Sequence, residues 1–144
     1  MKILYFEDQE EKYKHVREVL IETRASLTWK KDCQSGLMEL LETSYDYVLL
    51  DMSMPICEDG ITKDNFESFA GMSVLREIKR KKYNTKVIVI TGFNDFEKGT
   101  ELITLKELID EIGEKYPQYY YGYVKYDSTS VEWQEHLKKL LRVK

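Results

Sequence analysis

The chain has 144 residues, of which 42% are hydrophobic and 33% are charged, and its formal net charge is −4. This length and composition fit one globular domain, and the negative charge argues against a broad nucleic-acid interface, which needs a clustered basic face. No apolar run approaches the ~20 residues of a membrane span, no signal peptide precedes Ile3, and the two cysteines form no disulfide framework, so we expect a cytoplasmic protein.

Apolar runs alternate with helical stripes along the chain. Strands are predicted at residues 2–6, 27–29, 47–50, 87–90 and 120–125, and helices at 10–24, 33–42, 72–82, 100–112 and after a capping box at Thr129-x-x-Glu132. This alternation predicts an α/β fold of the flavodoxin-like, doubly wound type. It has a five-stranded parallel sheet in the order 2-1-3-4-5 with helices on both faces. No linker marks a second domain, so residues 1–144 are expected to fold as one.

Acidic residues follow two of these strands. Glu7 and Asp8 end the first strand, and Asp51 ends the third, which is its neighbour in the predicted sheet. Two carboxylates about 4 Å apart repel by roughly 4 kcal/mol at an effective dielectric near 20, so a cluster of three favours a bound cation. Hard oxygen ligands favour Mg²⁺. The alternative interpretation is an acidic surface cluster that binds no ion.

Four short motifs stand in order, each at the carboxyl end of its own predicted strand. They are Glu7-Asp8, Asp51-x-x-Met54-Pro55, Thr91-Gly92 and Lys125. Each motif is weak by itself, but together and in this order they resemble the receiver domain of two-component response regulators. The resemblance covers essentially the whole chain and agrees with the fold that the strand pattern predicts.

The resemblance implies a phosphoacceptor and a metal site. Asp51 would take a phosphoryl group from a phosphohistidine of a histidine kinase or a histidine phosphotransfer protein. Asp8, Asp51 and the backbone carbonyl of Ser53 would bind Mg²⁺ directly, while Glu7 would act through water. Such a protein is a signalling domain and not an enzyme in the usual sense, because it catalyses only its own phosphorylation and dephosphorylation.

The resemblance also implies a switch. The hydroxyl of Thr91 and the ammonium group of Lys125 would bind phosphoryl oxygens, and the fourth helix, the fifth strand and the last helix would then change as an interaction surface for a downstream protein. With no DNA-binding domain attached, we expect a stand-alone receiver in a phosphorelay. The alternative is that the chain is a fragment of a larger regulator.

Two segments are longer than in the family. The loop at 56–70 is an acidic insertion, which is interpreted either as a lid over the site or as a solvated loop. Lys125 lies 34 positions after Thr91, and the additional residues are expected to lengthen the fourth-helix region at 92–118. The family's output surface is therefore expected to differ here.

The fifth strand also departs from the family. Gly122 stands three positions before Lys125, where the family has an aromatic switch residue, and Tyr126 replaces the proline after the lysine. Either no aromatic switch operates, or a bulge at Gly122 shifts the register and lets a tyrosine take its role. A group of nearby tyrosines forms an interaction surface or packs under the last helix: residues 119, 120, 121, 123 and 126.

Three other functions are alternatives to a phosphoacceptor. A flavin binder would need hydroxyl and N–H groups where Glu7 and Asp8 stand, and an aspartate-based phosphatase would need a second acid where Ser53 stands. The remaining alternative is a receiver-like interaction module that acts independently of phosphorylation. Its sign would be loss of the acid pair, of Asp51 or of Lys125, and all of these residues are present.

Overall fold

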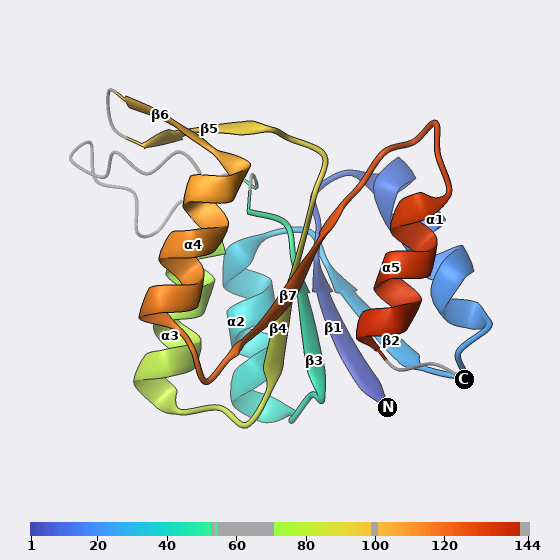
Figure 1. Cartoon of the computed structure of the whole chain (residues 1–144). Coiled ribbons are helices and arrows are strands. Elements are labelled where there is room, and N and C mark those ends of the chain that lie inside the picture. The colour runs from blue at the N-terminus through green and yellow to red at the C-terminus, as the bar shows by residue number, and fades with distance from the viewer. Residues whose placement is uncertain (53, 55–70, 99–100, 142–144) are drawn as a thin grey trace.

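A computed structural model describes residues 1–52, 54, 71–98 and 101–141 (Figure 1). The elements in chain order are β1 (Lys2–Phe6), α1 (Glu10–Ile21), β2 (Ser26–Lys30), α2 (Cys33–Glu42), β3 (Tyr47–Leu50), α3 (Gly71–Lys81), β4 (Lys86–Thr91), β5 (Asp95–Lys98), β6 (Glu101–Thr104), α4 (Leu105–Lys115), β7 (Tyr120–Lys125) and α5 (Glu132–Leu140). The predicted insertion at 56–70 lies outside the described residues, as do Ser53 and Pro55.

The main sheet is parallel and has the order β2-β1-β3-β4-β7, which confirms the predicted order, with β7 as its fifth strand. Its central strands are apolar on both sides because both faces are covered. Helices α1 and α5 pack on one face, and α2, α3 and α4 pack on the other (Figure 1). Along β1, Leu4 and Phe6 face the second group of helices, while Ile3 and Tyr5 face the first.

The segment between β4 and α4 corrects one prediction. The additional residues do not lengthen the fourth helix from residue 100, because β5 and β6 pair as an antiparallel hairpin and α4 begins only at Leu105. Thr104 fixes this start with a capping box, in which its Oγ1 accepts from the Glu107 N–H at 3.1 Å. Leu102, which falls within the helix predicted at 100–112, lies in β6 and is 69% exposed.

The capping box predicted for the last helix is also wrong. The N–H and the hydroxyl of Thr129 both donate to Asp127 Oδ1, at 2.9 and 2.7 Å, so Thr129 closes a turn instead of capping α5. Helix α5 starts at Glu132 after Val131, which makes no side-chain cap hydrogen bond.

Strand β7 contains the bulge that one sequence interpretation required. Tyr120 pairs with Val87 and Gly122 with Ile88, so Tyr121 is an extra residue in the ladder. Gly122 lies under α5, where a Cβ would come within 2.9 Å of Leu140 Cδ2.

The tyrosines around this bulge contribute mainly to the core. Two of them pack on the α4 side and two on the α5 side, namely Tyr119 and Tyr120, and Tyr121 and Tyr126. Tyr123 is 38% exposed and contacts the ring of His136 edge-on. Packing therefore accounts for most of this group.

Candidate functional site

Three carboxylates meet at the carboxyl edge of the main sheet. β1 and β3 are paired so that Phe6 stands opposite Leu50, and the Asp51 N–H donates to the Phe6 carbonyl at 3.2 Å. The residues that follow these strands therefore lie side by side. One oxygen from each of Glu7, Asp8 and Asp51 lies within 4.8 Å of the others. Glu7 and Asp51 are buried, whereas Asp8 is exposed.

The Glu7 carboxylate is held by the protein itself. Its Oε1 accepts from the Tyr5 hydroxyl at 3.1 Å and lies 2.9 Å from Lys12 Nζ, and its Oε2 accepts from the Gln9 N–H at 3.1 Å. The pKa of Glu7 is raised to about 7, mainly by burial. The Lys12 ammonium group opposes this rise, and the negative charge of Asp51 adds to it. Because Glu7 is buried and both of its oxygens already have partners in the protein, it is less accessible to a metal ion than Asp8.

Lys12 belongs to the site, and the sequence reading did not include it. Its Nζ lies 2.9 Å from Glu7 and 3.8 Å from Asp51 Oδ1, and it donates to the Ile90 carbonyl at 3.2 Å. The residue is only 5% exposed. The signal that could have identified it is its place four residues before Val16, on the buried stripe of α1.

Thr91 and Lys125 stand opposite each other at the ends of β4 and β7. The Thr91 hydroxyl is buried and accepts from the Phe93 N–H at 3.1 Å, and Lys125 Nζ donates to the Gly92 carbonyl at 3.0 Å. Lys125 and Asp51 line the same pocket of about 310 Å³. The described residues that line it are Gln9, Lys12, Asp51, Gly92, Phe93, Lys125, Tyr126, Asp127 and Ser128.

Tyr126, at the place of the family's proline, connects this pocket to the α1–α5 face. Its N–H donates to the Thr91 carbonyl at 2.8 Å, and its hydroxyl lies 2.6 Å from His15 Nδ1. Lys12 Nζ lies 5.5 Å from the centre of its ring, and the Trp133 ring of α5 lies 5.0 Å away. A shift of the backbone at Tyr126 would therefore move a ring that packs against Trp133 of α5.

The donor set fits Mg²⁺. It consists of carboxylate oxygens at one edge of the sheet, which are the hard ligands that this cation prefers, and the exposed Asp8 leaves a path from solvent. The backbone carbonyl of Ser53, the remaining predicted ligand, lies outside the described residues.

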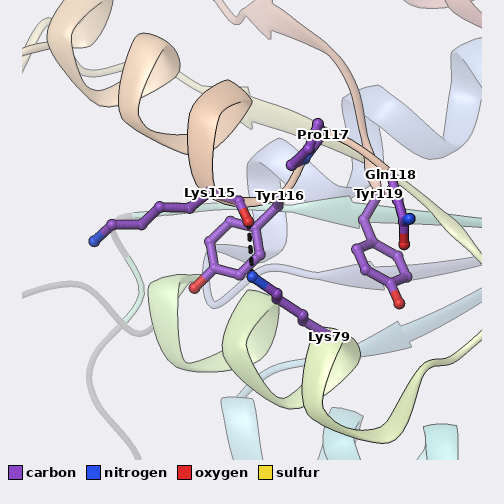
Figure 2. Close-up of a pocket in the computed structure, with 6 residues that line it drawn as sticks. All are labelled: Lys79, Lys115, Tyr116, Pro117, Gln118 and Tyr119. Carbon is purple, nitrogen blue, oxygen red and sulfur yellow. Dashed lines mark hydrogen bonds between the residues drawn. The ribbon is translucent and has the colours of Figure 1, made fainter.

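At the opposite end of the sheet, α4 leads into β7 (Figure 1). A second hollow lies there (Figure 2). It has a volume of about 210 Å³, and Lys79 Nζ donates there to the Lys115 carbonyl at 3.2 Å and lies 5.6 Å from the Tyr116 ring. Among the described residues its lining has no carboxylate and consists of Lys79, Lys115, Tyr116, Pro117, Gln118 and Tyr119. The acidic edge of the sheet is therefore the better candidate site for chemistry.

Sequence comparison matches the chain to known proteins. A sequence model of the response regulator receiver domain matches residues 3–107. The chain is 28% identical over 145 residues to the Detocs response regulatory protein DtcB of Enterobacter cloacae, which covers 96% of this chain and 97% of that protein. It is also 29% identical over 107 residues to the uncharacterized protein y4jR of Sinorhizobium fredii, over 72% of this chain and 71% of that protein.

Solved structures share the fold. Response regulator TrrA of Thermotoga maritima, in complex with Mg²⁺ and BeF, has a TM-score of 0.65 at 24% identity and covers 96% of this chain and 97% of that chain. RcsB of Salmonella enterica serovar Typhimurium, bound to promoter rprA, has a TM-score of 0.69 at 17% identity, over 99% of this chain and 66% of that one.

Among the described residues, no helix is both long and apolar enough to cross a membrane.

Proposed function

The chain belongs to the response regulator receiver family, and on that premise we propose that Asp51 accepts a phosphoryl group in a Mg²⁺-dependent reaction. The donor would be the phosphohistidine of a histidine kinase or of a histidine phosphotransfer protein. The observation that carries the proposal is the placement of Asp51, which lies beside Glu7 and Asp8 and lines a pocket with Lys125. A carboxylate nucleophile between acids and lysines suits transfer of an anionic group.

In the proposed reaction, one carboxylate oxygen of Asp51 attacks phosphorus. The O–P bond forms as the N–P bond breaks, and the imidazole keeps the electron pair and leaves as neutral histidine once its ring carries a proton. Mg²⁺, held by Asp8 and Asp51, would offset the charge that builds on the phosphoryl oxygens. Lys125 would leave the Gly92 carbonyl, now 3.0 Å from its Nζ, and pair with a phosphoryl oxygen.

The same contacts supply a switch in this proposal. The Thr91 hydroxyl accepts the Phe93 N–H and could at the same time donate its own proton to a phosphoryl oxygen, whereas Lys125 would have to leave the Gly92 carbonyl to reach one. Phosphorylation would then favour the state in which Lys125 has moved, because only that state makes both new contacts. Tyr126 carries the change to α5, so the proposed surface for a downstream protein comprises α4, β7 and α5.

Intact mass spectrometry after incubation with Mg²⁺ and acetyl phosphate tests the proposal. We expect one added phosphoryl group on the native protein, none on Asp51→Asn, and an unchanged yield on Asp110→Asn, which removes an exposed carboxylate of α4. No addition to the native protein, with its circular dichroism intact, would refute the proposal. That outcome would favour an interaction module that works without phosphorylation.

A further inference from the structure

Lys12 places a buried ammonium group among the acids of the site. Lysine is almost never fully buried unless it is paired, and this one is held by three separate segments. Its Nζ lies 2.9 Å from Glu7 at the end of β1, 3.8 Å from Asp51 at the end of β3, and 3.2 Å from the Ile90 carbonyl in β4. The ammonium position is therefore fixed by the sheet edge itself.

Lys14, two residues along the same helix, provides a contrast. Its side chain is 57% exposed and its Nζ lies 3.9 Å from Glu10, which is also exposed. An ion pair exposed to solvent in this way contributes little to the stability of the fold. The burial of Lys12 is thus a property of that position and not of α1 as a whole.

The charges of the cluster explain what Lys12 does there. The carboxylates of Glu7, Asp8 and Asp51 repel one another, and Lys12 balances part of their charge before any metal arrives. Because Mg²⁺ would be bound by Asp8 and Asp51, it would come close to the Lys12 ammonium, and the two cations repel each other. In a buried site this repulsion is only weakly screened by salt.

We propose that Lys12 is a built-in cation of the phosphoacceptor site, one that supplies part of the positive charge and weakens the binding of Mg²⁺. Glu7 is its partner and holds it in place, so Glu7 affects the metal through Lys12 and not as a ligand. This inference rests on the proposed function, since it takes Asp8 and Asp51 as the metal ligands. As a consequence, the site needs a higher Mg²⁺ concentration to be occupied than the same carboxylates would need without Lys12.

Isothermal titration of Mg²⁺ into the full chain tests this proposal. Loss of Lys12 by itself would leave the buried Glu7 carboxylate without its cationic partner. The decisive comparison is therefore made between E7Q and E7Q/K12M. We expect the Mg²⁺ dissociation constant of E7Q/K12M to be about tenfold lower than that of E7Q. The control E7Q/K14M, which removes an exposed lysine, should differ from E7Q by less than twofold.

Three outcomes separate the possibilities. Equal or weaker binding by E7Q/K12M would overturn the role of Lys12. Binding to the native chain but to no E7Q variant would also overturn it, because Glu7 would then be a metal ligand. Absence of binding to every protein, the native chain included, would instead refute the Mg²⁺ requirement of the proposed function.

A second readout guards against misfolded variants. The Trp29 indole donates to the Glu7 carbonyl at 2.7 Å, so its fluorescence should respond to Mg²⁺ at the same concentrations as the calorimetric signal. Replacing both members of a buried ion pair by neutral residues of similar size is often well tolerated. If circular dichroism nevertheless shows E7Q/K12M unfolded, E7Q/K12Q takes its place, with the same expected tightening.

Discussion

The buried carboxyl group of Glu7 should make the metal-free protein less stable as the pH rises from about 4.5 to about 7. Burial raises the pKa of Glu7 from 4.5 to about 7 in the folded protein, whereas the unfolded chain keeps the ordinary value. Between these two pH values the folded protein holds a proton that the unfolded chain has already released. Raising the pH therefore favours unfolding, which is the opposite of the behaviour of a salt-bridged surface acid.

The magnitude follows from the size of the shift. Each pKa unit corresponds to about 1.4 kcal/mol of differential stability, so a rise from 4.5 to about 7 corresponds to about 3 kcal/mol. This contribution is fully present below the pKa of the unfolded chain and is lost once the pH passes the pKa of the folded state. The substitution Glu7→Gln removes the titrating group and should remove this part of the pH dependence.

Urea unfolding in the presence of EDTA, followed by tryptophan fluorescence from about pH 4.5 to about pH 8, measures this effect. The free energy of unfolding of the native protein should fall over this range by about 3 kcal/mol more than that of Glu7→Gln. Glu10→Gln, which removes an exposed acid of α1, should keep the slope of the native protein. Identical slopes for the native protein and Glu7→Gln would refute a raised pKa for this carboxyl group.

Two further predictions concern the scaffold. Thr104→Ala removes the capping box of α4 and should lower the free energy of unfolding by about 1 kcal/mol in urea titrations, whereas Thr129→Ala, which removes no helix cap, should cost clearly less. Gly36→Ala would place a Cβ 2.1 Å from Phe6 Cε2, so thermal unfolding should show a loss of about 1–3 kcal/mol. An unchanged melting temperature would mean that the Phe6 ring moves aside at no cost.

Much of the fold and the acidic edge could be predicted because strong local patterns agreed with each other. Strands β3 and β4 are buried on both faces and therefore appear in the sequence as continuous apolar runs, which are typical of a parallel sheet covered on both faces. Once the sheet order was derived, the carboxylates after β1 and β3 had to meet, because parallel strands end at the same edge. The meeting of Glu7, Asp8 and Asp51 is a consequence of topology.

The hairpin before α4 could not be predicted in the same way. Leu102, Leu105 and Ile109 stand at helical spacing, so the stripe of α4 continues by chance into β6. The start of α4 at Leu105 is fixed by a tertiary contact as well as by the cap at Thr104. The Leu105 N–H donates to the Asn94 carbonyl at 2.7 Å, which closes the base of the hairpin and orients the first turn of α4. A threonine three residues before a glutamate occurs at both Thr104 and Thr129, and only the backbone around each decides which one caps a helix.

Lys12 was missed because lysine on a helix is normally assigned to solvent. The spacing from Lys12 to Val16 and Leu20 nevertheless places it on the stripe that α1 buries against the sheet. A buried ammonium group needs an anionic partner, and Glu7 and Asp8, a few residues before Lys12, end the strand that this helix follows. A lysine on the buried stripe of a helix that starts just after an acidic strand end therefore indicates an ion pair inside the site. Which of the acids Lys12 contacts depends on how β1 pairs with β3. The distances from Lys12 to Glu7 and Asp51 therefore cannot be predicted from the local sequence.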